Sequence, residues 1–197
     1  MRVYFAPLDG VTDALFRRVH FQTFSGVDKY FIPFVSPSQS MSFTVRENTE
    51  LSTRANAGVP VVPQVLARDA DLAVAMTRFL RDAGYGEVNL NLGCPSGTVT
   101  GKGKGAAMLR NLEELRHFLD RVYANAALPV SIKTRIGFDT DENWPRLLEL
   151  YRQYPVHELI VHPRTRAQAY TGEARREVCA EAGRLPSIPF VYNGDLF

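Results

Sequence analysis

A cysteine beside a glycine-rich loop is the feature of this sequence with the clearest chemical potential. Cys94 stands in the stretch NLGCP, directly after an apolar run. Four glycines follow it, namely Gly97, Gly101, Gly103 and Gly105. Because glycine admits positive φ and close approach to a ligand, we expect a mobile loop at a binding site, with a thiol that serves as nucleophile or proton donor. The competing interpretation is a cysteine that only packs, the role we expect for Cys179.

Polar side chains also stand at the ends of six apolar runs. They are Asp9, Gln64, Asn91, Lys133, His162 and Asn193. Lys133 and Arg135 are two residues apart, so on a strand they point to the same side. A lysine buried there needs an anionic or electron-rich partner, because burying its charge alone is costly. An exposed lysine at the strand end is the alternative.

Metal and nucleotide motifs are not evident. No cluster of His, Cys or carboxylate residues has the spacing of metal ligands, and no Ser/His/Asp arrangement stands out. Between Gly97 and Gly101 there are three residues where a P-loop has four, and Gly103 stands where that motif has Ser or Thr. We therefore expect no metal site and no P-loop.

Seven apolar runs predict the strands that position these residues. They are 3–8, 30–35, 61–66, 87–92, 129–134, 158–162 and 189–193. Helical periodicity predicts helices at 13–24, 69–83, 143–154 and 173–183, and a further helix that Asn111 caps. The polar stretch 36–53 stays unassigned.

The alternation of strands and helices predicts βαβ units and a parallel sheet. A doubly wound sheet would concentrate its ligand contacts at one switch point. Six strands that each end in a polar residue instead favour a (β/α)8 barrel, whose active site collects residues from many strand ends. We therefore predict an α/β fold, an incomplete TIM barrel of about seven strands, in one domain over residues 1–197.

Composition agrees with one globular domain. The 197 residues are 45% hydrophobic and 22% charged, with a net charge of +2. The weak charge neither indicates nor excludes a local nucleic-acid surface. Two distant cysteines, no signal peptide and no long apolar stretch predict a cytoplasmic protein without a membrane segment.

The order of these motifs resembles the tRNA-dihydrouridine synthase family. The matching stretches are APLDGVTD, PQVLA, VNLNLGCPSGTVTGKGKGAAML, SIKTRIGFD, ELIVHPRTRAQAYTG and PFVYNGDLF. They run through the whole chain, and the loop that begins GCPS is similar to that of the bacterial members. The resemblance implies a (β/α)8 barrel in which FMN sits at the mouth.

It also implies roles for individual residues. The residues it implies for FMN binding are Pro7, Leu8, Asp9, Gln64, Lys133, His162, Asn193, Gly194 and Asp195. Those it implies for the substrate are Asn91, Arg135 and Tyr170. The implied reaction uses NADPH to reduce FMN, which passes hydride to C6 of a uridine in tRNA, while Cys94 protonates C5 as the catalytic acid.

Two departures from the family qualify this expectation. Pro163 stands where the family commonly has glycine, and members of the family are longer. The eighth strand, its phosphate-binding loop and a helical domain that holds tRNA would then be missing, and the first and seventh strands would be open edges for self-association. The alternatives are another FMN-dependent barrel oxidoreductase, similar to dihydroorotate dehydrogenase, and an inactive fragment that binds no flavin.

Overall fold

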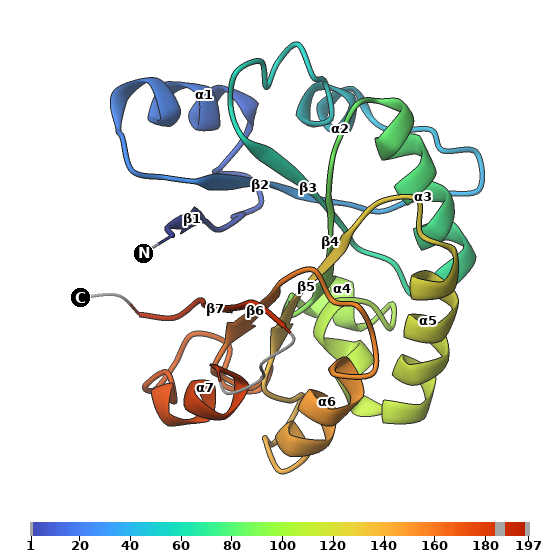
Figure 1. Cartoon of the computed structure of the whole chain (residues 1–197), viewed down its shortest axis with the longest axis vertical. Coiled ribbons are helices and arrows are strands. Elements are labelled where there is room, and N and C mark those ends of the chain that lie inside the picture. The colour runs from blue at the N-terminus through green and yellow to red at the C-terminus, as the bar shows by residue number, and fades with distance from the viewer. Residues whose placement is uncertain (1, 184–187, 196–197) are drawn as a thin grey trace.

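Seven parallel strands form one sheet that curls so that its helices lie on the outside (Figure 1). The computed structural model describes residues 2–183 and 188–195. The strands are β1 (Tyr4–Phe5), β2 (Lys29–Val35), β3 (Val61–Val65), β4 (Val88–Leu92), β5 (Val130–Arg135), β6 (Leu159–His162) and β7 (Phe190–Tyr192). The helices are α1 (Ala14–Thr23), α2 (Val45–Glu50), α3 (Ala70–Asp82), α4 (Gly97–Thr100), α5 (Leu112–Asn125), α6 (Trp144–Tyr151) and α7 (Arg176–Gly183), with a 3-10 helix η1 (Gly105–Arg110).

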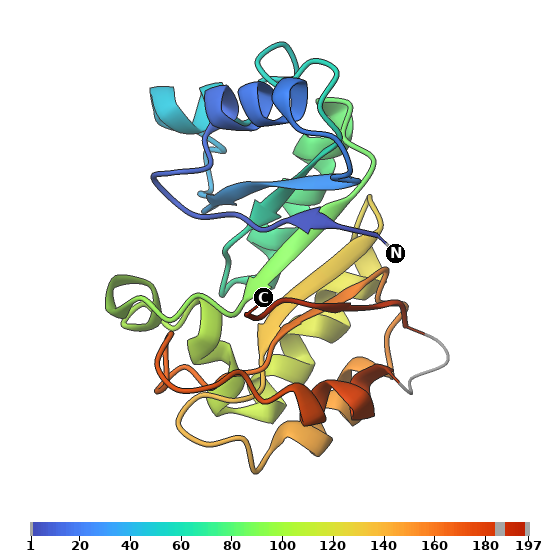
Figure 2. The same ribbon diagram turned by 90° about the vertical axis from the view of Figure 1, so that its left-hand side faces the viewer.

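The strands follow one another in sequence order from β1 to β7, and each pairs in parallel with the next. A doubly wound sheet would reverse its strand order at a switch point, so this order excludes that alternative. The architecture is that of an incomplete (β/α)8 barrel, as the sequence predicts. Within the described residues β1 and β7 each have one strand neighbour, and both lie on the open side, near the chain ends (Figures 1 and 2).

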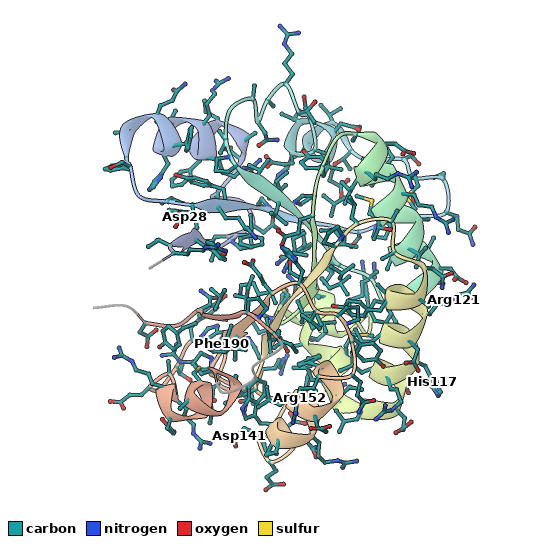
Figure 3. The ribbon with its side chains drawn as sticks, in the orientation of Figure 1. Asp28, His117, Arg121, Asp141, Arg152 and Phe190 are labelled. Carbon is teal, nitrogen blue, oxygen red and sulfur yellow. The ribbon has the colours of Figure 1, made fainter. Side chains whose placement is uncertain are left out.

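Side chains of each strand alternate between the inside of the curl and the helix-covered face. On the inside, Phe31, Val62 and Ile160 form an apolar cluster. On the helix-covered face, Leu90, Ile132 and other strand residues pack with the helices in the larger core. Figure 3 shows side chains on both faces of the sheet, whereas His117, Arg121 and Arg152 lie on the outer surface. The outer face of the sheet therefore packs against the helices, whereas the inner face lines the inside of the curl.

Local signals set where the helices begin and end. Asp69 caps α3 and Asn111 caps α5 through side-chain oxygens that accept from backbone N–H groups of the first turn. After α3, Gly84 adopts φ +94°, a conformation that favours glycine at a helix end. In the stretch left unassigned, Thr44 and Glu47 form a capping box at the start of α2.

Three predicted elements are shorter in the structure by three residues at one end: the strand predicted for 3–8 and the helices predicted for 143–154 and 173–183. The first strand is only two residues long, because it pairs with β2 through Tyr4 and Phe5 alone and the chain then turns into the loop before α1. The glycine-rich loop after β4 contains two short helices, α4 and η1. Hydrogen bonds from Gly101 N to Gly97 O and from Ala106 N to Cys94 O fold this loop back on itself.

Candidate functional site

A pocket of about 300 Å³ lies at the carboxyl ends of the strands. It collects residues from the carboxyl halves of β2, β3, β4, β5 and β6, and from the loops after β1, β4 and β6. Its lining consists of Pro7, Leu8, Asp9, Pro33, Phe34, Gln64, Asn91, Gly93, Cys94, Pro95, Ser96, Lys133, Arg135, His162 and Tyr170. This is the end of a parallel barrel at which ligands bind.

Cys94 is held at the wall of this pocket by a hydrogen bond from its backbone and by close packing of the loop that follows it. The Asn91 side chain accepts hydrogen bonds from the backbone N–H groups of Gly93 (3.1 Å) and Cys94 (2.8 Å). Gly105, at φ +60°, packs so closely that an added Cβ would lie 3.1 Å from Cys94 Cβ and 2.9 Å from Val99 Cγ1. The glycine therefore allows the returning loop to approach the cysteine closely, and the thiol remains partly exposed to the pocket.

Lys133 is a cation without a protein partner in this pocket. Within the described residues its ammonium group takes part in no hydrogen bond and no ion pair, although the side chain is half-buried. Burial, and then the charge of Arg135, lower the pKa of Lys133 to about 8. A desolvated ammonium group that faces a cavity is suited to an anionic or electron-rich ligand.

Arg135 joins three segments around the pocket. Its Nε donates to Gly93 O at 2.8 Å, and its Nη1 donates to Thr165 O (2.9 Å) and Ala169 O (2.7 Å). The guanidinium carbon lies 5.4 Å from the ring centre of Tyr170. Arg135 is 2% exposed, so its main visible task is to tie the cysteine loop to the loop after β6.

His162 is kept neutral by its surroundings. Burial, and then the positive charges of Arg135 and Lys133, lower its pKa to about 3. Its Nε2 lies 3.2 Å from Arg164 Nη1, which can only donate, so Nε2 is the acceptor. The ring therefore meets a ligand without adding a positive charge.

The segment after β7 is fixed by an ion pair. Arg164 binds both carboxylate oxygens of Asp195, at 3.0 and 2.6 Å, and also donates to Gly172 O. The hydrogen bond from Arg164 lowers the pKa of Asp195. Since Arg164 is buried and planar, this two-pronged contact fixes the direction of the chain at Asp195.

The structure brings most of the residues selected from the sequence into one pocket. Those in its lining are Pro7, Leu8, Asp9, Gln64, Asn91, Cys94, Lys133, Arg135, His162 and Tyr170. Asn193 instead lines an adjoining cavity of about 440 Å³ between β1 and β7, whose lining also includes Lys133. Gly194 and Asp195 line neither cavity, and Asp9 is an exposed partner of Arg46 at 2.7 Å.

Two residues behind the pocket were not selected from the sequence. Asn89 and Ser131 lie deeper inside the curl, and Asn89 donates to Ser131 at 2.9 Å. The signal that could have found them is period two on a strand: Asn89 shares a face with Asn91, and Ser131 shares one with Lys133.

Some features are absent from the part of the chain that the structure describes. There, no group of three or more His, Cys, Asp or Glu side chains is placed to hold a metal ion. No helix in residues 2–183 and 188–195 has the length and apolarity needed to span a membrane. Both cysteines are free thiols.

Fold and pocket together define an incomplete (β/α)8 barrel with a pocket at its carboxyl rim. The sequence profile described as Dihydrouridine synthase (Dus) matches residues 4–197. The chain therefore belongs to the dihydrouridine synthase family.

Individual relatives agree with this assignment. The chain is 30% identical to a "Probable tRNA-dihydrouridine synthase" of Rhodobacter capsulatus over 98% of its length and 60% of the relative. It is 29% identical to "tRNA-dihydrouridine synthase B" of Pasteurella multocida, over 99% of this chain and 58% of the relative. It is 31% identical to "Probable tRNA-dihydrouridine synthase 1" of Synechocystis sp., over 100% and 55%. The chain thus spans less than two thirds of the length of these relatives.

Proposed function

We propose that residues 1–197 form the FMN-binding catalytic barrel of a cytoplasmic tRNA-dihydrouridine synthase, which reduces the C5–C6 double bond of a uridine in tRNA. The observation that carries this proposal lies in one pocket, where a lysine without a protein partner among the described residues stands near a cysteine on a closely held loop. Family membership supports the same reaction. It also favours this reaction over that of a dihydroorotate dehydrogenase.

The pocket residues fit a flavin. Lys133 has no protein anion to bind within the described chain, so the electron-rich N1/O2 side of an isoalloxazine ring is a suitable partner. The neutral His162 borders the same space, and Pro7 and Leu8 supply an apolar wall. FMN bound here would supply hydride, which it has taken from NADPH, to C6 of the uracil ring.

The residues of the chain would complete the reduction. Hydride at C6 leaves negative charge at C5, and the Cys94 thiol would donate its proton there, becoming a thiolate that solvent reprotonates. Asn91 holds the backbone of Cys94, and Arg135 holds the carbonyl of the preceding residue. We assign Asn91, Arg135 and Tyr170 to contacts with the uracil or its phosphate, and Gln64, Asn193, Gly194 and Asp195 to the flavin side.

The first test is flavin retention. The purified chain is incubated with FMN and desalted, and its visible absorbance is measured for the parent, Lys133→Met and the control Lys104→Met. We expect bound flavin in the parent and control and a loss of at least about tenfold in affinity for Lys133→Met, since one charge-assisted contact is worth about 1.5–3 kcal/mol. A parent chain that retains no flavin at any concentration would identify it as a form without a working cofactor site.

The second test is turnover. Dihydrouridine formed in unmodified tRNA is measured with NADPH for the parent, Cys94→Ala and the control Cys179→Ala. We expect Cys94→Ala to lower the rate by about 10²–10⁴-fold, the usual contribution of a general acid, while NADPH still reduces the flavin. Full activity of Cys94→Ala would remove the cysteine from the mechanism.

A further inference from the structure

A continuous path of side-chain hydrogen bonds crosses the inside of the curled sheet, and it begins at the cysteine loop. Asn91 Oδ1 accepts from the backbone N–H groups of Gly93 and Cys94. Asn91 Nδ2 donates to Gln64 Oε1 at 2.7 Å. The backbone that carries the thiol is thereby linked to β3 and β4.

The path continues inward through residues that face one another in the sheet. Gln64 Nε2 donates to Asn89 Oδ1 at 2.8 Å, and Asn89 Nδ2 donates to Ser131 Oγ at 2.9 Å. Ser131 Oγ lies 2.7 Å from Glu87 Oε1 and 3.3 Å from Val88 O, so the carboxylate is the nearer acceptor. Gln64, Asn89 and Ser131 are at most 1% exposed, so bulk water does not replace a partner that is lost.

A charged cluster at the amino ends of the strands anchors the path. Lys29 Nζ lies 2.7 Å from Glu87 Oε2 and 2.7 Å from Glu158 Oε2, and Tyr4 donates to Glu158 Oε1 at 2.5 Å. His157 Nε2 is 3.7 Å from Glu87. Burial acts to lower the pKa of Lys29, but its hydrogen bonds to Glu158 and Glu87 outweigh burial and raise it. The cluster therefore places the Glu87 carboxylate, which is paired with Lys29, against Ser131.

Both ends of the path impose the same direction on it. The Ser131 hydroxyl donates its single proton to Glu87 Oε1, so its oxygen must accept from Asn89. At the other end two backbone N–H groups can only donate, so Asn91 must turn its oxygen toward them and its nitrogen toward Gln64. Every amide between the two ends then has one orientation that satisfies all its neighbours. Asn91 has both oxygen lone pairs occupied and can offer a ligand only its second N–H.

We propose that Ser131 and Asn89 are positioning residues, which hold the amides of Gln64 and Asn91 and through them the Cys94 loop. A role of these two residues in catalysis rests on the proposed function, whereas their effect on the position of the Cys94 loop does not. Neither residue lines the pocket. If Ser131 is removed, Asn89 loses its acceptor, and a reversed amide chain would point the nitrogen of Asn91 at the N–H groups of Gly93 and Cys94.

The test measures the loop without flavin or tRNA. In Ser131→Ala we expect backbone hydrogen exchange at Gly93 and Cys94, resolved by NMR, to accelerate about tenfold, the loosening that loss of one hydrogen bond allows. Alkylation of Cys94 by iodoacetamide should change by a similar factor. The control Thr77→Val removes a buried hydroxyl on α3, which donates to Val74 O and accepts from Ala127 N, outside this path.

Rescue and the parent protein supply two further readouts. Ser131→Thr keeps the hydroxyl, so its exchange and alkylation rates should stay within about twofold of the parent, well short of the effect of a lost hydrogen bond. In the parent, the side-chain NH₂ groups of Gln64, Asn89 and Asn91 should each show a slowly exchanging proton, because each donates a hydrogen bond in the path. This measurement does not depend on any variant being able to fold.

The outcomes separate this proposal from the proposed function. Unchanged exchange at Gly93 and Cys94 in Ser131→Ala, an equal change in Thr77→Val, or rapid exchange of all three side-chain amides in the parent would each overturn it. Loosened amides in a protein that never reduces uridine would support the path and count against the enzymatic role. In an active protein, Ser131→Ala should lower kcat more than it raises KM.

Discussion

Replacement of Lys133 by methionine should stabilise the unliganded chain while it weakens flavin binding. The pocket desolvates the Lys133 ammonium group, and no described residue pairs with it. Methionine has a similar length and no charge, so the replacement removes this desolvated cation. The difference between a pKa of 10.5 and one of about 8 corresponds to about 3 kcal/mol of unfolding free energy. In a chain of this size that is a rise of about 6–12 °C in Tm.

The pH dependence has a definite sign. Because folding lowers the pKa of Lys133, the folded state prefers the neutral amine. Below about pH 8 the group is charged in both states and the full penalty is present. Between about pH 8 and 10.5 the unfolded state binds the extra proton, so the penalty shrinks, and above 10.5 it is gone. The advantage of Lys133→Met should therefore fall as pH rises through this window.

The assay is urea unfolding of the parent, Lys133→Met and Lys104→Met from pH 7 to 10.5, without FMN and in a buffer without polyvalent anions. Lys104 lies in the glycine-rich loop and serves as the matched control. A Lys133→Met chain that is no more stable than the parent at pH 7 would refute the reasoning, as would an advantage that does not change with pH.

Three further predictions concern the loop, the buried ion pair and the open sheet edges. Gly105→Ala should destabilise the chain by about 1–3 kcal/mol in urea unfolding, because φ is +60° and the new Cβ would crowd Cys94; wild-type stability would contradict this. Glu50→Ala leaves Arg17, which is 0% exposed, without its 2.8 Å carboxylate, so urea should reveal a loss of about 3–5 kcal/mol. Glu149→Ala, which removes an exposed ion pair with Arg152, should cost far less. Within the described residues β1 and β7 each pair with one strand only, so the chain should self-associate as its concentration rises, which light scattering will detect; a monomer at all concentrations would show that these edges are protected.

Much of the fold follows from patterns that are local in the sequence. Apolar runs separated by helical periods predict all seven strands, and Asp69 and Asn111 mark helix starts that the structure confirms. These signals work because capping and amphipathic spacing act within a few residues. Polar residues at strand ends likewise predict one rim, since parallel strands share an orientation.

The sequence was less informative where a residue depends on distant partners. Arg17 in α1 is buried, because Glu50 and Asn56 supply acceptors at 2.8 and 2.7 Å, whereas Leu15 and Val19 of the same helix are exposed. Helical periodicity alone would place the arginine outside and the two aliphatic residues inside. A buried charge is tolerated only where its partners are already in place, and those partners lie more than 30 residues away.

By itself, the sequence determined the alternating strands and helices, the rim of polar residues and the family. Only the tertiary structure decided how those residues are arranged. Among the described residues Lys133 faces the pocket without a protein anion, and Arg135 links two loops. Asn89 and Ser131 connect the Cys94 loop to charges at the amino ends of the strands. The physical reason is the distance along the chain over which each interaction acts. Propensity and capping act between near neighbours, whereas burial, desolvation and the direction of a hydrogen bond depend on groups that only the folded sheet brings together.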